Sequence, residues 1–248
     1  MSKYEHLSIG RIVAENLAAA VIFEKHGMDF CCHGEQTLKE ACLKHGIDLD
    51  ELISELEALE RPSNKEQLEF SDMNIAELAE FIVQTHHTFT KKVLSAIPDR
   101  LDTVIRVHGC RHPELAELQT EFTPFSEKLT IHLQKEEEIL FPDLEDMVQS
   151  QQNASFNSDV SFLGTVSRII GEMEQEHEIA GEILDRIHTL TNGFKAPGDA
   201  CNTYRLLYRE LASLEQDLHC HIALENYMLF PKAIELERIL FIKKRSTI

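Results

Sequence analysis

The feature that most constrains this chain is a phrase that it contains twice. HLQKEEEILFP runs from His132 to Pro142, and HIALENYMLFP runs from His221 to Pro231. The two histidines stand 89 positions apart, and the same offset relates the glutamates that follow them four residues later, Glu136 and Glu225. Residues four apart lie on the same face of an α-helix. Each copy therefore predicts a helix that presents an imidazole and a carboxylate side by side.

A second match extends the duplication to a whole helical hairpin. HTFTKKVLSAI from His87 aligns with HEIAGEILDRI from His177, at an offset of 90. Two hairpin copies in a bundle relate equivalent residues by a pseudo-twofold axis. The duplication therefore predicts two similar metal positions between four helices.

The spacing of helix breakers predicts an all-α fold. The 248 residues include only 10 glycines and 7 prolines, and the stretches between them are rich in Leu, Glu and Ala. We expect a small N-terminal helical domain (1–60), a polar linker (61–73) and an antiparallel four-helix bundle (74–240). The expected bundle helices are Asn74 to Ala96 with Pro98 as a stop, Pro113 to Pro142, Phe162 to Leu190, and Pro197 to Pro231 or beyond.

Three short helices are expected in the leading part of the chain. The first runs from a Ser8 N-cap to a terminating Gly27, the second from Thr37 to Gly46, and the third follows in DLDELISELEALE. The loop MDFCCHGEQ between the first two carries adjacent cysteines, Cys31 and Cys32.

Charge and hydropathy exclude several classes of partner. The net charge is −19, which argues against nucleic acid or an anionic membrane as the main partner. No apolar run reaches about 18 residues, and MSKYEHLSIG at the N-terminus has no apolar signal core, so we expect a cytoplasmic protein. The six cysteines show no regular framework and are expected to be reduced.

The duplicated pairs predict a buried metal centre. A buried carboxylate costs several kcal/mol unless it is compensated, and a metal ion supplies that compensation. Four histidines and two glutamates form the set, and such a mixture suits iron among the first-row metals. Carboxylates can bridge two ions about 3.5–4 Å apart. The expected ligands are His87, His132, Glu136, His177, His221 and Glu225, with His108 as a fifth imidazole that has no repeat partner.

Three alternatives remain open at this point. Any single pair of His and Glu four apart is more often a solvated pair on a helix surface. His86 competes with His87 as the first ligand, although the repeat alignment favours His87. Glu137 and Glu138 are expected to form a solvated face.

The arrangement resembles known di-iron bundles. Ferritin-like proteins use Glu-x-x-His, whereas the order His-x-x-x-Glu with more histidines than carboxylates resembles hemerythrin. MDFCCHG followed by TLKEAC resembles the leading domain of the iron–sulfur cluster repair di-iron proteins, the repair of iron centres family. The resemblance covers nearly the whole chain; its one departure is a longer QSQQNASFNSD region, expected as a surface loop. His33 stands where a small residue is frequent in the family, and its role stays open.

The resemblance implies a non-haem centre of two iron ions in the bundle. It also implies a cytoplasmic protein, induced by nitric oxide or oxidative stress, whose partners are damaged iron–sulfur proteins; a homodimer stays open. The family's ligand pattern matches His87, His108, His132, Glu136, His177, His221 and Glu225, and its paired cysteines match Cys31 and Cys32.

The paired cysteines and the centre leave three functions in competition. Adjacent cysteines form no comfortable disulfide with each other. We expect reactive thiols whose thiolate is favoured near a helix N-terminus; the alternative is one buried filler and one merely exposed side chain. The main interpretation is a protein that supplies or handles iron for cluster repair, which leaves the term enzyme open. The others are an oxidoreductase that reduces nitric oxide and, less favoured because of the cysteines, an oxygen-binding or iron-storing hemerythrin.

Overall fold

The computed structural model describes residues 2–59, 70–152 and 164–246, and its chain divides into two compact units. Unit 1 comprises residues 1–79, 144–167 and 219–248, and unit 2 comprises residues 80–143 and 168–218. Within the described ranges, regular secondary structure is helical apart from one isolated β-bridge between Ser8 and Thr37. No helix among the described residues is long and apolar enough to cross a membrane. The expected all-α class is confirmed.

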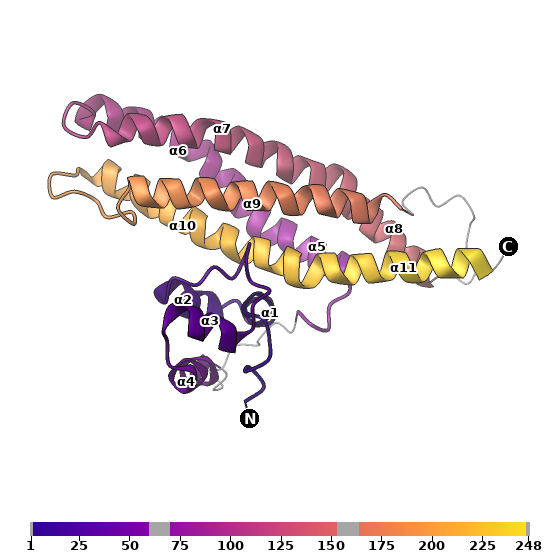
Figure 1. Cartoon of the computed structure of the whole chain (residues 1–248). Helices are drawn as coiled ribbons and strands as arrows, with labels where there is room; N and C mark the ends of the chain where they lie inside the picture. Colours follow the sequence, from indigo (N-terminus) through magenta and orange to yellow (C-terminus); the bar gives the residue numbers. More distant parts are fainter. Residues whose placement is uncertain (1, 60–69, 153–163, 247–248) are drawn as a thin grey trace. The chain divides into compact units, whose positions relative to one another are not determined.

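Unit 2 contains the expected helical bundle. Figure 1 shows α6 (Thr88–His108), α7 (Glu114–Lys135), α9 (Val166–Leu190) and α10 (Asn202–Leu224) running side by side. Their apolar faces bury a continuous core that includes Ile97, Leu101, Phe122, Phe125, Leu184, Ile187, Tyr204, Leu207, Leu211 and Leu214. The short connection between α6 and α7 makes these neighbours antiparallel.

The expected stop at Pro98 is wrong, because α6 continues through it to His108. A proline inside a helix costs about 3 kcal/mol through its missing N–H and its clash with the preceding turn. Ile97, Leu101 and Val104 around it are buried in the core. Burying several such side chains, at about 1.5–3 kcal/mol each, outweighs the cost of one proline.

In the described part of the chain, three single-turn π-helices interrupt the bundle helices. η1 (Val83–His87) joins α5 (Ile75–Ile82) to α6, η2 (Glu136–Leu140) joins α7 to α8 (Phe141–Gln152), and η3 (Glu225–Leu229) joins α10 to α11 (Phe230–Ser246). The two helices that were expected to reach Pro142 and Pro231 therefore do not end at these prolines, and each continues beyond its proline. In both copies of the repeated phrase the π turn begins at the glutamate and ends directly before the Phe-Pro pair.

Unit 1 contains the leading helices α1 (Ile9–Glu15), α2 (Ala19–Lys25), α3 (Leu38–His45) and α4 (Leu49–Leu59). The first expected helix is in fact two, because Asn16 adopts an extended conformation and its side chain accepts a hydrogen bond from the N–H of Ala18. The Ser8 N-cap is confirmed, as are positive φ angles at Gly27 and Gly46. Thr37 and Glu40 form a reciprocal capping box at the start of α3.

The leading helices pack on the start of the second repeated phrase. Ile222 and Ala223 are buried in one core cluster with Ile9, Phe23, Phe30 and Leu38. In the same unit, α11 caps the first residues of α9. The carboxylate of Glu237 accepts hydrogen bonds from the N–H groups of Val166 and Ser167. These contacts tie the leading residues to the segment that carries His221 and Glu225.

Two expectations fall partly outside the described residues. Residues 61–69 of the expected linker belong to a range that the structure does not describe. The same applies to residues 153–159 of the expected surface loop, whereas residues 149–152 are the last residues of α8. The expected start near Asn74 is confirmed, since its side chain accepts hydrogen bonds from the N–H groups of Ala76 and Glu77.

Candidate metal centre

Glu136 presents its two carboxylate oxygens to two different imidazoles in unit 2. Its Oε2 lies 3.3 Å from Nε2 of His87, and its Oε1 lies 3.2 Å from Nε2 of His132. The side chains of His87 and Glu136 are completely buried, and that of His132 is 7% exposed. A carboxylate placed in this way can bridge two ions, each also held by one of the histidines.

A third imidazole joins this group from the neighbouring helix. Nε2 of His177 lies 3.1 Å from Nε2 of His132, and the donor atoms of His132, His177 and Glu136 all lie within 4.8 Å of one another. His132 lies in α7, Glu136 begins η2 and His177 lies in α9; Figure 1 shows α7 and α9 running alongside each other. The bundle therefore brings together residues that the sequence separates by 45 positions.

The spacings match the donor set of a metal ion. First-row ions bind imidazole nitrogen and carboxylate oxygen at about 2.0–2.2 Å, so two ligands of one ion lie about 2.9 Å apart at a right angle and about 3.4 Å apart in a tetrahedron. The observed separations of 3.1, 3.2 and 3.3 Å fall between these values. Imidazole and carboxylate are a mixture suited to iron, zinc, manganese and related ions. The buried donors therefore fit a metal centre.

Two further carboxylates orient the ligand imidazoles, and sequence reasoning missed both. Oε1 of Glu137 lies 2.6 Å from Nδ1 of His87, and Oε2 of Glu176 lies 2.8 Å from Nδ1 of His132. Such a hydrogen bond fixes the tautomer and turns Nε2 toward the metal position. The expectation that Glu137 belongs to a solvated face is wrong. The sequence contained one signal for these two carboxylates. Glu137 directly follows the candidate ligand Glu136, and Glu176 directly precedes the candidate ligand His177.

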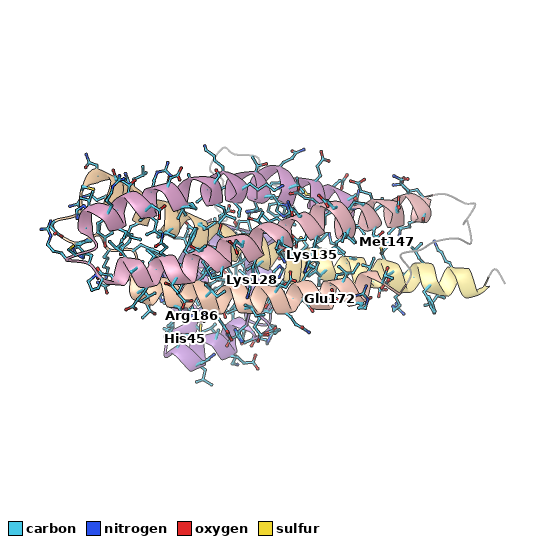
Figure 2. All side chains as sticks on the ribbon, turned by 90° about the horizontal axis from the view of Figure 1, so that it is seen from above. His45, Lys128, Lys135, Met147, Glu172 and Arg186 are labelled. Atoms are coloured by element: carbon cyan, nitrogen blue, oxygen red, sulfur yellow. The ribbon has the colours of Figure 1, made fainter. Side chains whose placement is uncertain are left out.

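Lysines hold these orienting carboxylates ionised. Lys91 contacts Glu137, and Lys135, labelled in Figure 2 on α7, contacts Glu176. The hydrogen bond from His132, reinforced by Lys135 against the opposing effect of burial, lowers the pKa of Glu176 to about 2. Burial opposes ionisation of Glu137 as well, but Lys91 and His87 outweigh it and lower the pKa. Both side chains therefore act as anionic acceptors at neutral pH.

The structure separates the roles of the adjacent histidines in η1. His87 lies against Glu136, whereas Nδ1 of His86 lies 3.0 Å from Oδ1 of Asp217 on α10. Successive side chains on a helix point about 100° apart, so only one of the two can face the centre. His87 is that residue, as the repeat alignment predicted.

The second repeated pair lies in unit 1 and has the same local geometry. Nε2 of His221 lies 3.2 Å from Oε1 of Glu225, and both side chains are buried. Asp217, His221 and Glu225 follow one another at intervals of four residues, so they occupy one face of the α10–η3 helix. The pair reproduces the 3.2 Å separation of His132 and Glu136.

His108 does not belong to this group, so its assignment as a ligand is wrong. It is the last residue of α6, 21 positions after His87 along one continuous helix, which places it about 30 Å away. Its ring lies among Tyr204 and His112, and among the described residues neither ring nitrogen has a hydrogen-bond partner. His108 was expected as a fifth imidazole without a repeat partner and as a match to the family's ligand pattern, and neither argument fixes its distance from His87.

Cys31 and Cys32 lie in the thiol loop, residues 28–36 between α2 and α3. Their sulfurs are 3.7 Å apart, well beyond the covalent S–S length of about 2.05 Å. Cys31 is buried and Cys32 is half-buried. Oδ1 of Asp29 accepts hydrogen bonds from the N–H groups of both cysteines and lies 3.4 Å from Sγ of Cys31.

The expected thiolate stabilisation by a helix N-terminus is wrong for Cys31. α3 begins only at Leu38, and the N-cap is Thr37. The neighbouring Cys32 thiol, burial and the Asp29 carboxylate together raise the pKa of Cys31 well above its usual range. In this structure the burial pattern of the pair is that of the alternative, one buried thiol beside one more exposed.

η3 holds the thiol loop in place. Nδ2 of Asn226 donates to the carbonyl of Cys31, and the N–H of Gly34 donates to the hydroxyl of Tyr227 at 2.7 Å. A Cβ on Gly34 would lie 2.2 Å from the carbonyl oxygen of Phe30, so only glycine fits this close approach. Asn226 and Tyr227 directly follow Glu225, so one short segment carries both a candidate ligand and the anchors of the thiols.

Comparisons with known proteins agree with both halves of this description. Residues 77–233 match the family described as Hemerythrin HHE cation binding domain, and residues 6–60 match the family described as Domain of Unknown function (DUF542). Curated proteins called iron-sulfur cluster repair protein YtfE, from Yersinia pseudotuberculosis serotype O:1b and Yersinia pestis strain Pestoides F, are each 33% identical to this chain over 234 residues. These matches cover 94% of this chain and 99% of the relatives.

This chain belongs to the iron–sulfur cluster repair protein family. The match over the whole length, with both family regions in the same order, confirms the resemblance inferred from the sequence. The hemerythrin-like region is the one that holds the buried imidazoles and carboxylates of the candidate centre.

Proposed function

We propose that this protein holds two iron ions in its bundle and uses them in the repair of damaged iron–sulfur clusters. Glu136 carries the proposal, because each of its two oxygens lies against a different buried imidazole. We propose Glu225 as the second bridge, since it is the repeat equivalent of Glu136. The terminal ligands in this proposal are His87, His132, His177 and His221.

Two observations support the assignment of His221 and Glu225 as ligands equivalent to those of the first repeat. The repeat offset equates His221 and Glu225 with His132 and Glu136. The hemerythrin match spans all six residues as one region. The same comparisons support our division into a leading domain (1–60), a linker (61–73) and a bundle (74–240).

In this proposal some residues hold the ions, and others orient the ligand imidazoles or exclude water from them. When bound, such a centre supplies exchangeable iron and one-electron chemistry. Glu137 and Glu176 keep the Nδ1 protons of His87 and His132 in place and leave both Nε2 atoms available for metal. Buried apolar neighbours such as Phe141, stacked on His87, exclude water from the donors.

Cys31 and Cys32 are proposed as the reactive groups that meet a partner, the damaged iron–sulfur protein, under nitric oxide or oxidative stress in the cytoplasm. Cys32 is the more accessible of the two, and Cys31 is buried behind it. The name of the relatives, iron-sulfur cluster repair protein, supports this function for the present chain.

The test is to add the iron-loaded protein to a purified cluster protein that has lost its cluster, and to measure cluster recovery. We expect recovery with the parent and a marked loss with the Cys31→Ala/Cys32→Ala variant, which should still bind about two irons. Unchanged recovery with that variant would refute the role of the thiols. The second candidate function, reduction of nitric oxide, uses the same ligands, so nitric oxide consumption with an electron donor is followed in parallel. Consumption without recovery would favour it over repair.

A further inference from the structure

The thiol loop gathers three donor atoms of the kind that bind a borderline-soft cation. A carboxylate oxygen of Asp29 and the sulfurs of Cys31 and Cys32 all lie within 4.8 Å of one another. All three residues belong to one loop of unit 1, and they form a donor group that shares no residue with the groups of histidines and glutamates. Thiolate sulfur is a ligand for zinc, iron, cobalt and related ions, and carboxylate oxygen commonly completes such sites.

The separations between these donors are those of ligands on one tetrahedral ion. Two sulfurs bound at about 2.3 Å to a tetrahedral ion lie about 3.8 Å apart, and the observed separation is 3.7 Å. A sulfur and an oxygen bound to the same ion at about 2.3 and 2.1 Å lie about 3.6 Å apart, against 3.4 Å observed between Cys31 and Asp29. These two separations suit a shared ion, and the donor atoms of the third pair, Cys32 and Asp29, lie within 4.8 Å of each other.

The surrounding residues fix this geometry. Oδ2 of Asp29 lies 2.6 Å from Nδ1 of His33, an arrangement that orients the carboxylate. The N–H groups of Cys31 and Cys32 both point at Asp29, and Asn226 holds the carbonyl of Cys31. Adjacent residues seldom direct their side chains to one point, and this loop has the hydrogen bonds that make them do so.

We propose that Asp29, Cys31 and Cys32 form a second metal site that binds one divalent first-row cation in an open, exchangeable position. Three protein ligands leave one tetrahedral position for water or for an incoming ligand, which is the pattern of reactive rather than structural sites. Cys32 and Asp29 are partly exposed, so that fourth position faces solvent. The site uses the two thiols that the proposed function assigns to contact with a partner, but metal binding at the loop is measured separately from cluster recovery and can be present or absent whatever the result of that test.

Titration with Co²⁺ tests the site directly. The full-length chain, already loaded with iron in its bundle, is titrated with Co²⁺ while the thiolate-to-cobalt charge-transfer absorption is followed. We expect one equivalent per chain to produce the band, because only sulfur ligands give it. Cys31→Ser/Cys32→Ser should abolish the band, whereas the matched control Cys110→Ser/Cys201→Ser, which removes two exposed cysteines elsewhere, should keep it.

The carboxylate is tested separately. Asp29→Asn keeps an oxygen for the two N–H groups but removes the negative charge, and we expect Co²⁺ affinity to fall ten- to a hundred-fold with the helical content unchanged. Absence of the band in the parent overturns the proposal. So does a band that survives Cys31→Ser/Cys32→Ser, or Co²⁺ affinity in Asp29→Asn equal to that of the parent.

Discussion

The segments around Glu136 and Glu225 are two copies of one sequence phrase, but their side chains contact different parts of the protein. The next position, Glu137 in the first copy and Asn226 in the second, differs in chemistry and in target. Glu137 accepts a hydrogen bond from a ligand histidine, whereas Asn226 donates one to the carbonyl of Cys31. One copy uses this position to support the metal centre, and the other uses it to anchor the thiol loop.

The flanking positions follow the same division. Gln134 and Glu138 are exposed in the first copy, while their equivalents Ala223 and Tyr227 are buried and half-buried in the second. Ala223 packs in the core of the leading helices, and Tyr227 accepts the N–H of Gly34. The difference teaches that the residues proposed as ligands are preserved between copies, whereas the residues between them adapt to the surface that each copy meets.

The largest expected effect tests whether the copies are equal as ligands. Glu136→Leu and Glu225→Leu should each lower the iron content from about two ions to less than one, because a lost bridge weakens both metal positions. Metal analysis after iron-replete expression measures this. Two irons in either variant would show that the copies are not equivalent.

The next largest effect distinguishes Glu137 from Asn226, the residues that directly follow the two proposed bridging glutamates. Glu137→Gln should weaken metal binding ten- to a hundred-fold, since the ligand His87 loses its anionic acceptor. Asn226→Ala should leave the affinity of the bundle for iron unchanged, because its partner is a backbone carbonyl in the thiol loop. Competition against a chelator measures both. Equal losses in the two variants would remove the functional distinction between the copies.

A smaller effect is expected one residue further on. Tyr227→Phe removes the acceptor of the Gly34 N–H but keeps the ring that packs on Gly10, so local opening of the thiol loop should become easier by about 1–3 kcal/mol. Amide hydrogen exchange at residues 30–36 reports it. The control is Glu138→Gln, the equivalent exposed position, for which we expect no change; similar exchange in both variants would contradict the anchoring role.

The smallest effect concerns His108, the expected ligand that has no equivalent in the second repeat. His108→Leu should leave iron binding unchanged, because His108 lies about 30 Å from His87 along α6. Since its ring nitrogens are buried without partners among the described residues, the free energy of unfolding should stay level or rise by about 1 kcal/mol. Chemical denaturation and metal analysis test both statements. Loss of one iron would restore His108 as a ligand.

Sequence periodicity by itself determined which residue types are proposed as ligands and that helices carry them. The interval of four between His132 and Glu136 is a property of a single helix, so it needs no tertiary information. The same holds for the caps at Ser8 and Thr37, whose side chains bond to N–H groups three residues away. The duplication added the equivalence of His221 and Glu225, since equal offsets require no knowledge of packing.

Tertiary structure decided what depends on neighbours distant in the chain. Whether α6 stops at Pro98 depends on the burial of the residues around it, and the position of His108 follows from that continuation. The choice of Glu137 and Glu176 as acceptors, and of Asn226 and Tyr227 as anchors, depends on which side chains reach across from another element. Local sequence encodes the helix and its faces, whereas burial and contacts across the fold depend on the whole chain.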